Sequence, residues 1–256
     1  MILDRFRLDG KVAIVTGAGR GIGEGAALAF AELGADVVCA ARTPEQIEAV
    51  AEKVRDRGGR ALAVPCDVME TAQLEEVVAR TLKEFDRIDI LVNNAGGTPP
   101  RPALETSESM FESAIHFNVT TAFSLSRRVI PHMLKGSGGS IVNISSAAGR
   151  LPQGNFVAYG TAKAALSFMT RQLAAEFAPD VRVNAIAVGA VETSALAPFL
   201  NDKVRGAMES LTPMKRIGQV EDIALAILYL ASPASSCVTG KVMEVDGGTE
   251  ATNWPF

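Results

Sequence analysis

The sequence predicts an α/β protein, in which a seven-stranded parallel sheet carries helices on both faces. Two observations support this fold class. Short apolar runs rich in β-branched residues alternate with longer helical stretches along the whole chain, and most of these runs are apolar at every position. Strands that alternate with helices pair in parallel, and strands covered on both faces lack exposed polar positions. We therefore expect one doubly wound sheet.

Four of the predicted strands lie in the first half of the chain. They span residues 11–16, 36–41, 60–65 and 88–92, and the helices between them span 22–33, 44–57 and 71–85. Pro44 suits the first turn of a helix, where its missing N–H would have no partner.

The second half repeats this alternation. A long helical region is expected over 106–133, further helices over 156–177 and 220–231, and strands over 139–145, 181–187 and 241–245. No linker separates the halves, so residues 1–256 are predicted to form a single domain, with a cofactor half at 10–150 and a catalytic and substrate half at 151–256. No firm element is predicted for 188–219, and long segments of this kind often act as lids or binding loops.

The composition argues against several classes of partner. Lys+Arg 25 against Asp+Glu 29 gives a net charge of −4, so neither nucleic acid nor an anionic membrane is the expected partner. The longest apolar run, 223–231, is far shorter than the roughly 18 residues that a membrane span needs. The charged N-terminus does not resemble a secretory signal. We expect a soluble, cytoplasmic protein.

The cysteines and histidines suggest no metal centre. Cys39, Cys66 and Cys237 show no C-x-x-C spacing, and we expect three buried thiols and no disulfide. His116 and His132 have no partners at ligand spacing and are expected to be structural or solvated.

A glycine-rich loop joins the first predicted strand to the first predicted helix. Residues 16–23 read T-G-A-G-R-G-I-G. Glycines in such a turn allow unusual backbone angles and let the main chain approach a pyrophosphate at the helix N-terminus, as in a Rossmann domain. The predicted cofactor-binding residues of this loop are Gly17, Arg20, Gly21, Ile22 and Gly23.

The end of the second strand indicates which cofactor is preferred. A carboxylate at this end would bind the adenosine ribose hydroxyls, but the strand ends in Ala41-Arg42, and Asp36 lies at its other end. Arg42, helped by Arg20, is suited to bind a 2′-phosphate. We expect NADP(H) to be preferred, with NAD(H) possible, and the alternative is that both arginines are merely solvated.

A tyrosine and a lysine stand one helical turn apart. Tyr159 and Lys163 share a helix face at i, i+4. An ammonium near a phenol lowers the phenol pKa from about 10, so that it can exchange a proton with a carbonyl or an alcohol. Ser146, at the end of a predicted strand upstream, is suited to hold the substrate oxygen.

These motifs, taken together and in this order, resemble the short-chain dehydrogenase/reductase family over essentially the whole chain. The motifs are the glycine loop, N-N-A-G at 93–96, Ser146, and Tyr159-x-x-x-Lys163. The resemblance implies that Tyr159 is the general acid or base, that Lys163 binds the nicotinamide ribose and lowers the tyrosine pKa, and that Ser146 polarises the carbonyl. It also implies that Asn118 holds a proton-relay water.

Further cofactor contacts follow from the same resemblance. Asp67 and Val68 are expected to flank the adenine, while Asn94, Ala95 and Gly96 line the cofactor. Val191 and Thr193 are expected to meet the nicotinamide carboxamide. The family usually carries Pro-Gly where this chain has Val188-Gly189, and we expect a freer turn but a retained activity.

The resemblance leaves the substrate open. A hydroxysteroid dehydrogenase, a 3-oxoacyl-thioester reductase and an NAD-dependent sugar or polyol dehydrogenase all remain compatible, as does a non-catalytic cofactor-sensing protein. The intact set of Asn118, Ser146, Tyr159 and Lys163 argues against the sensor. Residues 97–100, 150–155 and 188–213 are expected to line the pocket, and its apolar members favour a steroid-like or acyl substrate: Leu151, Leu196, Phe199, Leu200 and Met214.

The helix over 156–177 is apolar on more than one face. We expect the surplus to form a subunit interface of a homodimer or homotetramer. The single tryptophan, Trp254, is expected to be a terminal packing group or a subunit contact.

Overall fold

The seven strands form one parallel sheet in the order β3-β2-β1-β4-β5-β6-β7. This computed structural model describes residues 1–194 and 196–254. The strand bounds are β1 (Val12–Thr16), β2 (Asp36–Ala41), β3 (Ala61–Pro65), β4 (Ile90–Asn93), β5 (Gly139–Ser146), β6 (Val181–Val188) and β7 (Val242–Val245). The strand order reverses between β1 and β4, which creates the crevice where ligands bind in such sheets. The predicted fold class is confirmed.

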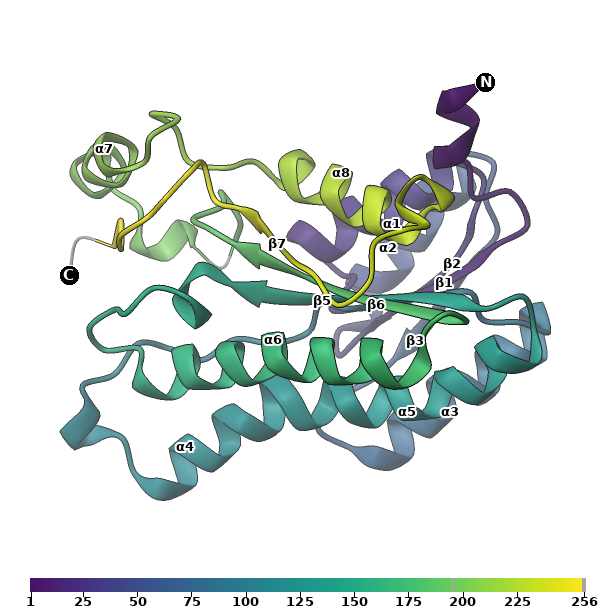
Figure 1. Cartoon of the computed structure of the whole chain (residues 1–256), viewed down its shortest axis with the longest axis horizontal. Helices are drawn as coiled ribbons and strands as arrows, with labels where there is room; N and C mark the ends of the chain where they lie inside the picture. The colour runs from purple at the N-terminus through teal and green to yellow at the C-terminus, as the bar shows by residue number, and fades with distance from the viewer. Residues whose placement is uncertain (195, 255–256) are drawn as a thin grey trace.

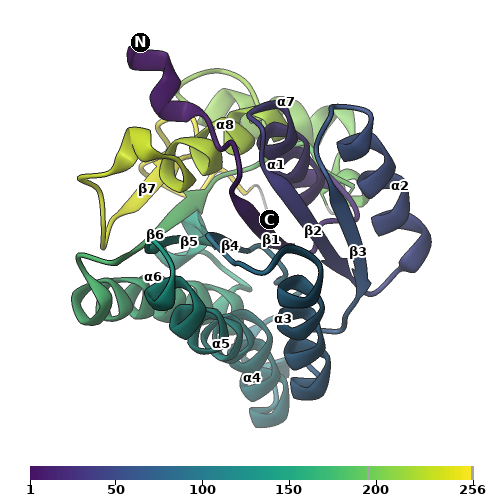
Figure 2. The ribbon, with the colours of Figure 1, turned by 90° about the vertical axis from the view of Figure 1, so that its right-hand side faces the viewer.

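Helices cover both faces of the sheet, as Figures 1 and 2 show. One face carries α1 (Gly21–Glu32), α2 (Pro44–Arg55) and α8 (Val220–Ala231), and the other carries α3 (Thr71–Phe85), α4 (Glu108–Ile115), α5 (Thr121–Lys135) and α6 (Val157–Phe177). Among the described residues, no helix combines the length and the apolar character needed to cross a membrane.

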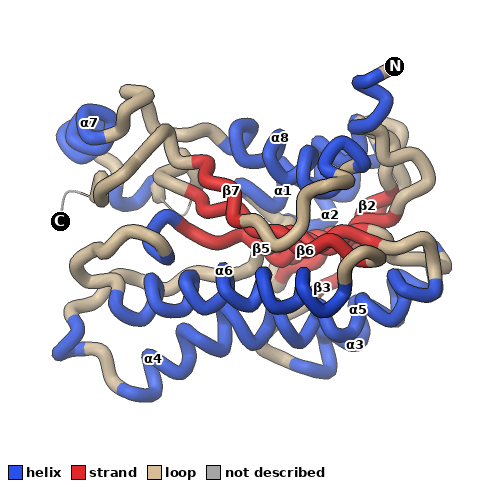
Figure 3. Tube along the Cα trace, in the orientation of Figure 1, coloured by secondary structure: helices blue, strands red, loops and turns tan. Residues whose placement is uncertain are grey.

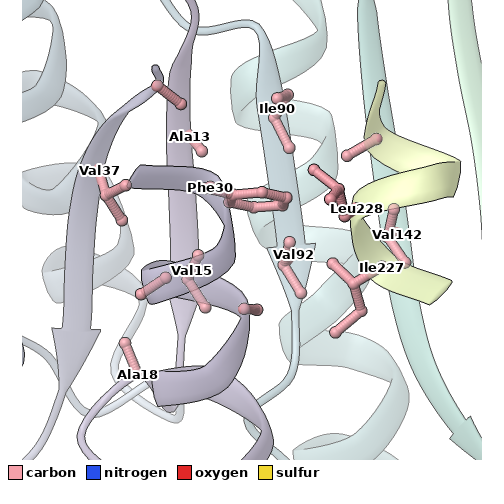
Figure 4. Packing of buried hydrophobic residues seen from close by; sticks show 14 of the residues in the cluster. Ala13, Val15, Ala18, Phe30, Val37, Ile90, Val92, Val142, Ile227 and Leu228 are labelled. Atoms are coloured by element: carbon pink, nitrogen blue, oxygen red, sulfur yellow. The ribbon is translucent and has the colours of Figure 1, made fainter. Parts of the chain in front are cut away.

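The core consists of one apolar layer on each side of the sheet. In β1, Ala13 and Val15 belong to the layer under α1, whereas Ile14 belongs to the opposite layer. Phe30 of α1 is fully buried, and Figure 4 shows it among the side chains of β1, β4 and α8. Burial on both faces explains why the strands read as unbroken apolar runs.

The long helical region predicted over 106–133 consists of two helices joined by one turn of π-helix, His116–Thr120. Ser107 begins the first helix, because its hydroxyl accepts a hydrogen bond from the Met110 amide (3.2 Å). Turns of π-helix are frequent at functional sites, and this one contains Asn118.

The stretch 188–219, for which no element was predicted, contains a helix, α7 (Asp202–Leu211). Asn201 caps it by accepting a hydrogen bond from the Val204 amide (3.0 Å). Only Val204 and Met208 of this helix are buried, and they pack with Ile217 in a small cluster apart from the main core. So short an apolar stripe gives a weak periodic signal in the sequence. Figure 3 shows α7 at the left-hand end of the view, beyond the end of β7.

A buried polar network ties the centre of the sheet to the helices beneath it. The Asn93 amide of β4 donates to Asn143 Oδ1 of β5 (2.8 Å) and to the Ser126 hydroxyl (3.1 Å). Asn143 in turn donates to the Thr170 hydroxyl of α6 (2.9 Å). Such networks fix a unique arrangement when every member has a partner, and here they hold α6 in register with β5.

The variant Asn143→Ala should lower the free energy of unfolding by about 1–3 kcal/mol, because it leaves buried partners without their hydrogen bonds. Urea unfolding followed by circular dichroism measures this change. Gln172→Ala, which removes an exposed amide from α6, is the control and should change little. Equal effects of the two variants would contradict a stabilising role for the network.

Candidate active site

A cleft with a volume of about 930 Å³ opens at the carboxyl ends of the strands. It is lined by the glycine loop, the ends of β2, β4 and β5, the start of α6, the segment after β6 and the C-terminal residues. All of the predicted site residues line the cleft except Gly23 and Asn118, which lie directly behind its wall. The size is in the range of ligand-binding sites.

The glycine loop has the close packing that a bound pyrophosphate requires. Gly17 and Gly21 have φ angles of +64° and +56°, which favour glycine. A Cβ atom on Gly17 would lie 2.8 Å from Asn94 Nδ2, and one on Gly23 would overlap the Gly17 carbonyl. The loop leads directly into the N-terminus of α1, where backbone N–H groups attract anions. These residues therefore fit a dinucleotide cofactor.

Two arginines lie at the adenosine end of the cleft. Arg20 and Arg42 line it, are exposed, and make no side-chain hydrogen bond or ion pair with any residue that the structure describes. Asp36 lies at the opposite end of β2, where it accepts a hydrogen bond from the Arg60 amide (3.0 Å). The cleft thus presents two cations, and no β2 carboxylate, at the end where the adenosine ribose is expected.

After β3, two residues border the same end of the cleft. Asp67 accepts a hydrogen bond from the Met69 amide (3.0 Å), which closes a tight turn. Val68 is buried and packs into the core layer beneath the sheet. Both line the cleft, where an adenine ring is expected.

Asn118 links the π-helical turn to the loop after β4. Its Oδ1 accepts from the Gly97 amide (2.9 Å), and its Nδ2 donates to the Ala114 carbonyl (2.9 Å). A Cβ atom on Gly96 would lie 2.8 Å from Asn118 Oδ1 and 3.1 Å from Lys163 Nζ. The absence of a side chain at Gly96 therefore allows Asn118 and Lys163 to approach each other.

Tyr159 and Lys163 lie one turn apart on α6, with Lys163 Nζ 5.7 Å from the centre of the Tyr159 ring. Lys163 is buried, and its ammonium donates to the Ile144 carbonyl of β5 (2.8 Å). Burial lowers the pKa of Lys163 to about 8.

The pKa of Tyr159 moves in the direction opposite to the one expected. Burial raises it, and this effect exceeds the opposing interaction with the Ser146 hydroxyl. Lys163 is directed toward the Ile144 carbonyl rather than toward the phenol oxygen. In this structure the expectation that Lys163 lowers the pKa of Tyr159 is therefore wrong.

The two adjacent serines have different surroundings. The Ser145 hydroxyl is buried and bonds to the Lys163 carbonyl (3.0 Å) and the Ser167 hydroxyl (2.8 Å) of α6. Ser146 is half-buried beside Tyr159, and its hydroxyl accepts from the Ala148 amide (3.2 Å). Ser146, with Tyr159, faces the cleft as the sequence predicted.

The segment after β6 is well anchored even though Val188 replaces the proline usual in the family. Val188 is the last residue of β6 and pairs with Ser146 and Val245. Val191 bridges to Gly218, and the Glu192 amide donates to the Gly218 carbonyl (2.8 Å). The backbone on both sides of this turn is thus held by hydrogen bonds, and the freer turn expected from Val188 stays a prediction.

The substrate end of the cleft departs from the prediction in several positions. Residues 97–100, Leu151 and Leu196 line it as expected, but Leu200 and Met214 do not. Met214 is 64% exposed, because it lies in the turn after α7 rather than in the cleft. The side chain of Phe199 lies outside the described residues.

Trp254 and Phe156 line this end of the cleft instead, together with Met208. Trp254 was expected to be a packing or subunit-contact residue, and the structure shows it in the cleft wall. The only sequence signal for Phe156 was its position three residues before Tyr159. For Trp254 there was none, since only folding brings the C-terminal residues to the cleft.

The cysteines follow the expectation only in part. Cys39 and Cys66 are buried, which raises the pKa values of their thiols to about 12 and about 11. Cys237 is exposed, so the expectation of three buried thiols is wrong. Within the described part of the chain, no group of three His, Cys, Asp or Glu side chains is placed to hold a metal ion.

Comparisons with known proteins agree with this geometry. A family described as enoyl-(acyl carrier protein) reductase matches residues 17–250. An uncharacterized oxidoreductase of Mycobacterium tuberculosis is 50% identical over 99% of this chain and 97% of its own length. The 7α-hydroxysteroid dehydrogenase of Escherichia coli is 39% identical over 96% of each chain.

A solved structure of a 7α-hydroxysteroid dehydrogenase in complex with NADH and 7-oxoglycochenodeoxycholic acid is also similar. It superposes with a TM-score of 0.94 at 39% identity, covering 96% of this chain and 97% of that one. The chain belongs to the short-chain dehydrogenase/reductase family. It is an NAD(P)-dependent oxidoreductase that acts on CH–OH and C=O groups.

The pKa of Lys163 makes stability depend on pH. The unfolded chain holds this proton up to its ordinary pKa of 10.5, whereas the folded protein releases it near 8. Between these values unfolding takes up a proton, so this group makes the free energy of unfolding rise with pH. Below about pH 8 the buried ammonium opposes folding.

Urea unfolding of the cofactor-free protein between pH 7 and pH 10.5 tests this expectation. The free energy of unfolding of Lys163→Met should lack this rise. The difference in this free energy between Lys163→Met and the wild type should therefore change between pH 7 and pH 10.5. Lys135→Met, which removes an exposed lysine, should follow the wild type. Parallel curves for wild type and Lys163→Met would show that Lys163 does not titrate in this range.

Proposed function

We propose that this protein is an NADP(H)-preferring oxidoreductase for ketones and secondary alcohols with an apolar, steroid-like body. The observation that carries the proposal is the convergence of Ser146, Tyr159 and Lys163 in one cleft. At one end of this cleft lie two arginines that have no side-chain partner among the described residues, and at the other end lies an apolar wall.

Membership of the short-chain dehydrogenase/reductase family implies a role for each of these side chains. In reduction, the Tyr159 hydroxyl donates its proton to the substrate oxygen, and Ser146 donates a hydrogen bond to the same oxygen. Lys163 binds the nicotinamide ribose, and Asn118 holds the water that returns the proton from solvent. Oxidation reverses the proton movement, with Tyr159 as the base. When bound, the nicotinamide cofactor supplies or accepts the hydride.

The remaining cleft residues bind the cofactor. The glycine loop, with Gly17, Gly21, Ile22 and Gly23, holds the pyrophosphate at the start of α1. Asp67 and Val68, which line the cleft, would flank the adenine. Asn94, Ala95 and Gly96 line the centre, and Val191 and Thr193 meet the carboxamide.

The preference for NADP(H) rests on Arg20 and Arg42. Both are free to form charge-assisted hydrogen bonds with a 2′-phosphate, and the described residues offer no carboxylate at the end of β2 to bind an unmodified ribose. The related hydroxysteroid dehydrogenase structure holds NADH, so both cofactors have to be compared directly.

The preference for an apolar substrate rests on the far end of the cleft. Of the described lining residues only Arg20, Arg42, Asp67 and Lys163 carry a charge. The first three belong to the cofactor half, and Lys163 lies beside Tyr159 at the catalytic centre. Leu151, Leu196 and Met208 contribute aliphatic surface at the other end. The 7-oxo bile acid in the related structure is a ligand of this type.

We also propose that the protein is a homodimer or homotetramer. Phe123 of α5 and Val157 and Phe168 of α6 are 43%, 43% and 57% exposed on one side of the molecule. Large apolar side chains that gather on one face commonly mark a subunit contact.

The variant Tyr159→Phe should lose about 10²–10⁴-fold in turnover, because it lacks the proton that catalysis transfers. Oxidation of NADPH, followed by absorbance at about 340 nm, measures this with ketosteroids, an acetoacetyl thioester and small diketones. Tyr229→Phe changes the only other tyrosine, which lies in α8 against Phe6, and should keep its activity. NADPH binding should persist in both variants. Turnover retained by Tyr159→Phe would refute the assigned role.

The variant Arg42→Ala should raise the KM for NADPH about tenfold and the KM for NADH much less, because loss of a charged hydrogen bond costs about 1.5–3 kcal/mol. Initial rates with each cofactor measure the difference. Arg55→Ala, which removes an exposed arginine of α2 that pairs with Glu48, is the control. Equal changes with both cofactors would show that Arg42 does not bind the 2′-phosphate.

A further inference from the structure

The C-terminal segment 246–254, termed here the tail, crosses the substrate end of the cleft. Thr249, Thr252, Asn253 and Trp254 of this segment line the cavity. The tail follows β7, the last strand at this edge of the sheet, and Figure 1 shows it running toward α7. The final part of the sequence therefore contributes to a cavity whose cofactor end is built from the first part.

Arg150 fastens the start of the tail to the catalytic side of the cleft. It lies four positions after Ser146 and forms ion pairs with Glu244 (3.3 Å), Asp246 (3.0 Å) and Glu250 (3.1 Å). It also donates to the Thr249 carbonyl. The Asp246 side chain is only 4% exposed, so this pair is shielded from solvent more than ordinary surface pairs are.

A second contact fixes the end of the tail. The Asn253 amide donates to the buried Thr212 hydroxyl (2.9 Å), just after α7. Trp254 packs against the small apolar cluster formed by Val204, Met208 and Ile217. The tail is therefore held at both ends, and the indole position is determined by the fold.

Three aromatic rings connect the tail to the catalytic tyrosine. The ring centres of Trp254 and Phe156 lie 5.8 Å apart at an interplanar angle of 76°, and those of Phe156 and Tyr159 lie 5.8 Å apart at 63°. Edge-to-face pairs of this kind are favourable and directional. The indole thus forms a rigid wall one ring beyond the tyrosine.

From this arrangement we propose that Trp254 is a specificity-determining residue, which selects ketones with a large apolar ring system, and that Arg150 is the positioning residue that keeps the tail in place. The proposal rests on the proposed function. A fused-ring ketone whose oxygen meets Tyr159 extends past Phe156 onto the indole, whereas a small diketone does not reach that far.

Tryptophan fluorescence tests the proposed contact between Trp254 and a bound ketosteroid, and it does not require turnover. Trp254 is the single tryptophan of the chain, so emission excited at the red edge of tryptophan absorption comes from this site alone. Titration with several ketosteroids in the presence of NADP⁺ should shift or quench this emission, and titration with a small diketone should not. If no ketosteroid changes the emission, Trp254 does not contact such ligands and the proposal is overturned.

Steady-state kinetics tests whether Trp254 discriminates between ketosteroids and small diketones. In Trp254→Ala the ratio of kcat/KM for a ketosteroid to kcat/KM for a small diketone should fall by about tenfold or more, because a large apolar contact is lost. Most of the change should lie in the ketosteroid KM, and Trp254→Phe should recover part of it. Arg150→Ala should lower the same ratio. Arg60→Ala, which removes an arginine paired with Glu84 and Asp36 beside β3, is the matched control and should keep the wild-type ratio.

The outcomes separate this inference from the proposed function. A change in Trp254 emission without turnover of any ketone would refute the proposed function but support the contact between Trp254 and the ligand. Turnover of ketosteroids with an unchanged ratio of the two kcat/KM values in Trp254→Ala would support the proposed function but refute the role of Trp254 in specificity. A lowered ratio in Trp254→Ala but not in Arg150→Ala would overturn the positioning role of Arg150.

Discussion

The site depends on one set of hydrogen bonds, between the ends of β1 and β4. The Thr16 hydroxyl accepts hydrogen bonds from the backbone amides of Asn94 (3.0 Å) and Ala95 (3.1 Å), and it donates one to the Val92 carbonyl (3.3 Å). Asn94 donates back to the Thr16 carbonyl (2.9 Å). These bonds join the glycine loop to the loop after β4 at the point where the strand order reverses. Because Thr16 is buried, they are shielded from water, and they fix both walls of the crevice.

The catalytic side of the cleft is aligned from this point by further polar contacts. The loop after β4 bonds to Asn118, and Gly96 leaves room for Asn118 to lie close to Lys163. Lys163 donates to the Ile144 carbonyl of β5, while the Ser145 hydroxyl bonds back to α6. The helix that carries Tyr159 is thus held against the strand that carries Ser146. Proton transfer requires this kind of fixed geometry, since catalytic groups have to lie within hydrogen-bond reach of the reacting oxygen.

The two ends of the cleft have different chemistry. Cations and tightly packed glycines lie near the first strands, whereas aromatic and aliphatic side chains lie near α7 and the tail. The cofactor end combines short segments that follow successive strands, from the glycine loop after β1 to the loop after β4, together with the segment after β6. The substrate end combines segments from residue 97 to residue 254, so relatives with the same catalytic residues can differ in what they accept. This difference explains why the comparisons establish the family and the reaction class but leave the substrate to experiment.

The sequence by itself determined the sheet, most helix bounds and the residues at the cofactor end. Short, continuous apolar runs marked most of the strands. The glycine loop, Ser146, Tyr159 and Lys163 belong to motifs whose residues stand at recognisable spacings along the sequence. Tertiary structure decided the rest. The pKa of Tyr159 depends on the burial of the phenol and on the direction of the Lys163 side chain. Ser145 faces α6 and Ser146 faces the cleft, a difference that only the fold determines. The helix α7 is stabilised by only a short apolar stripe. Trp254 reaches the cleft only because β7 ends beside β6 and Arg150 holds the residues that follow, a long-range contact that no local pattern encodes.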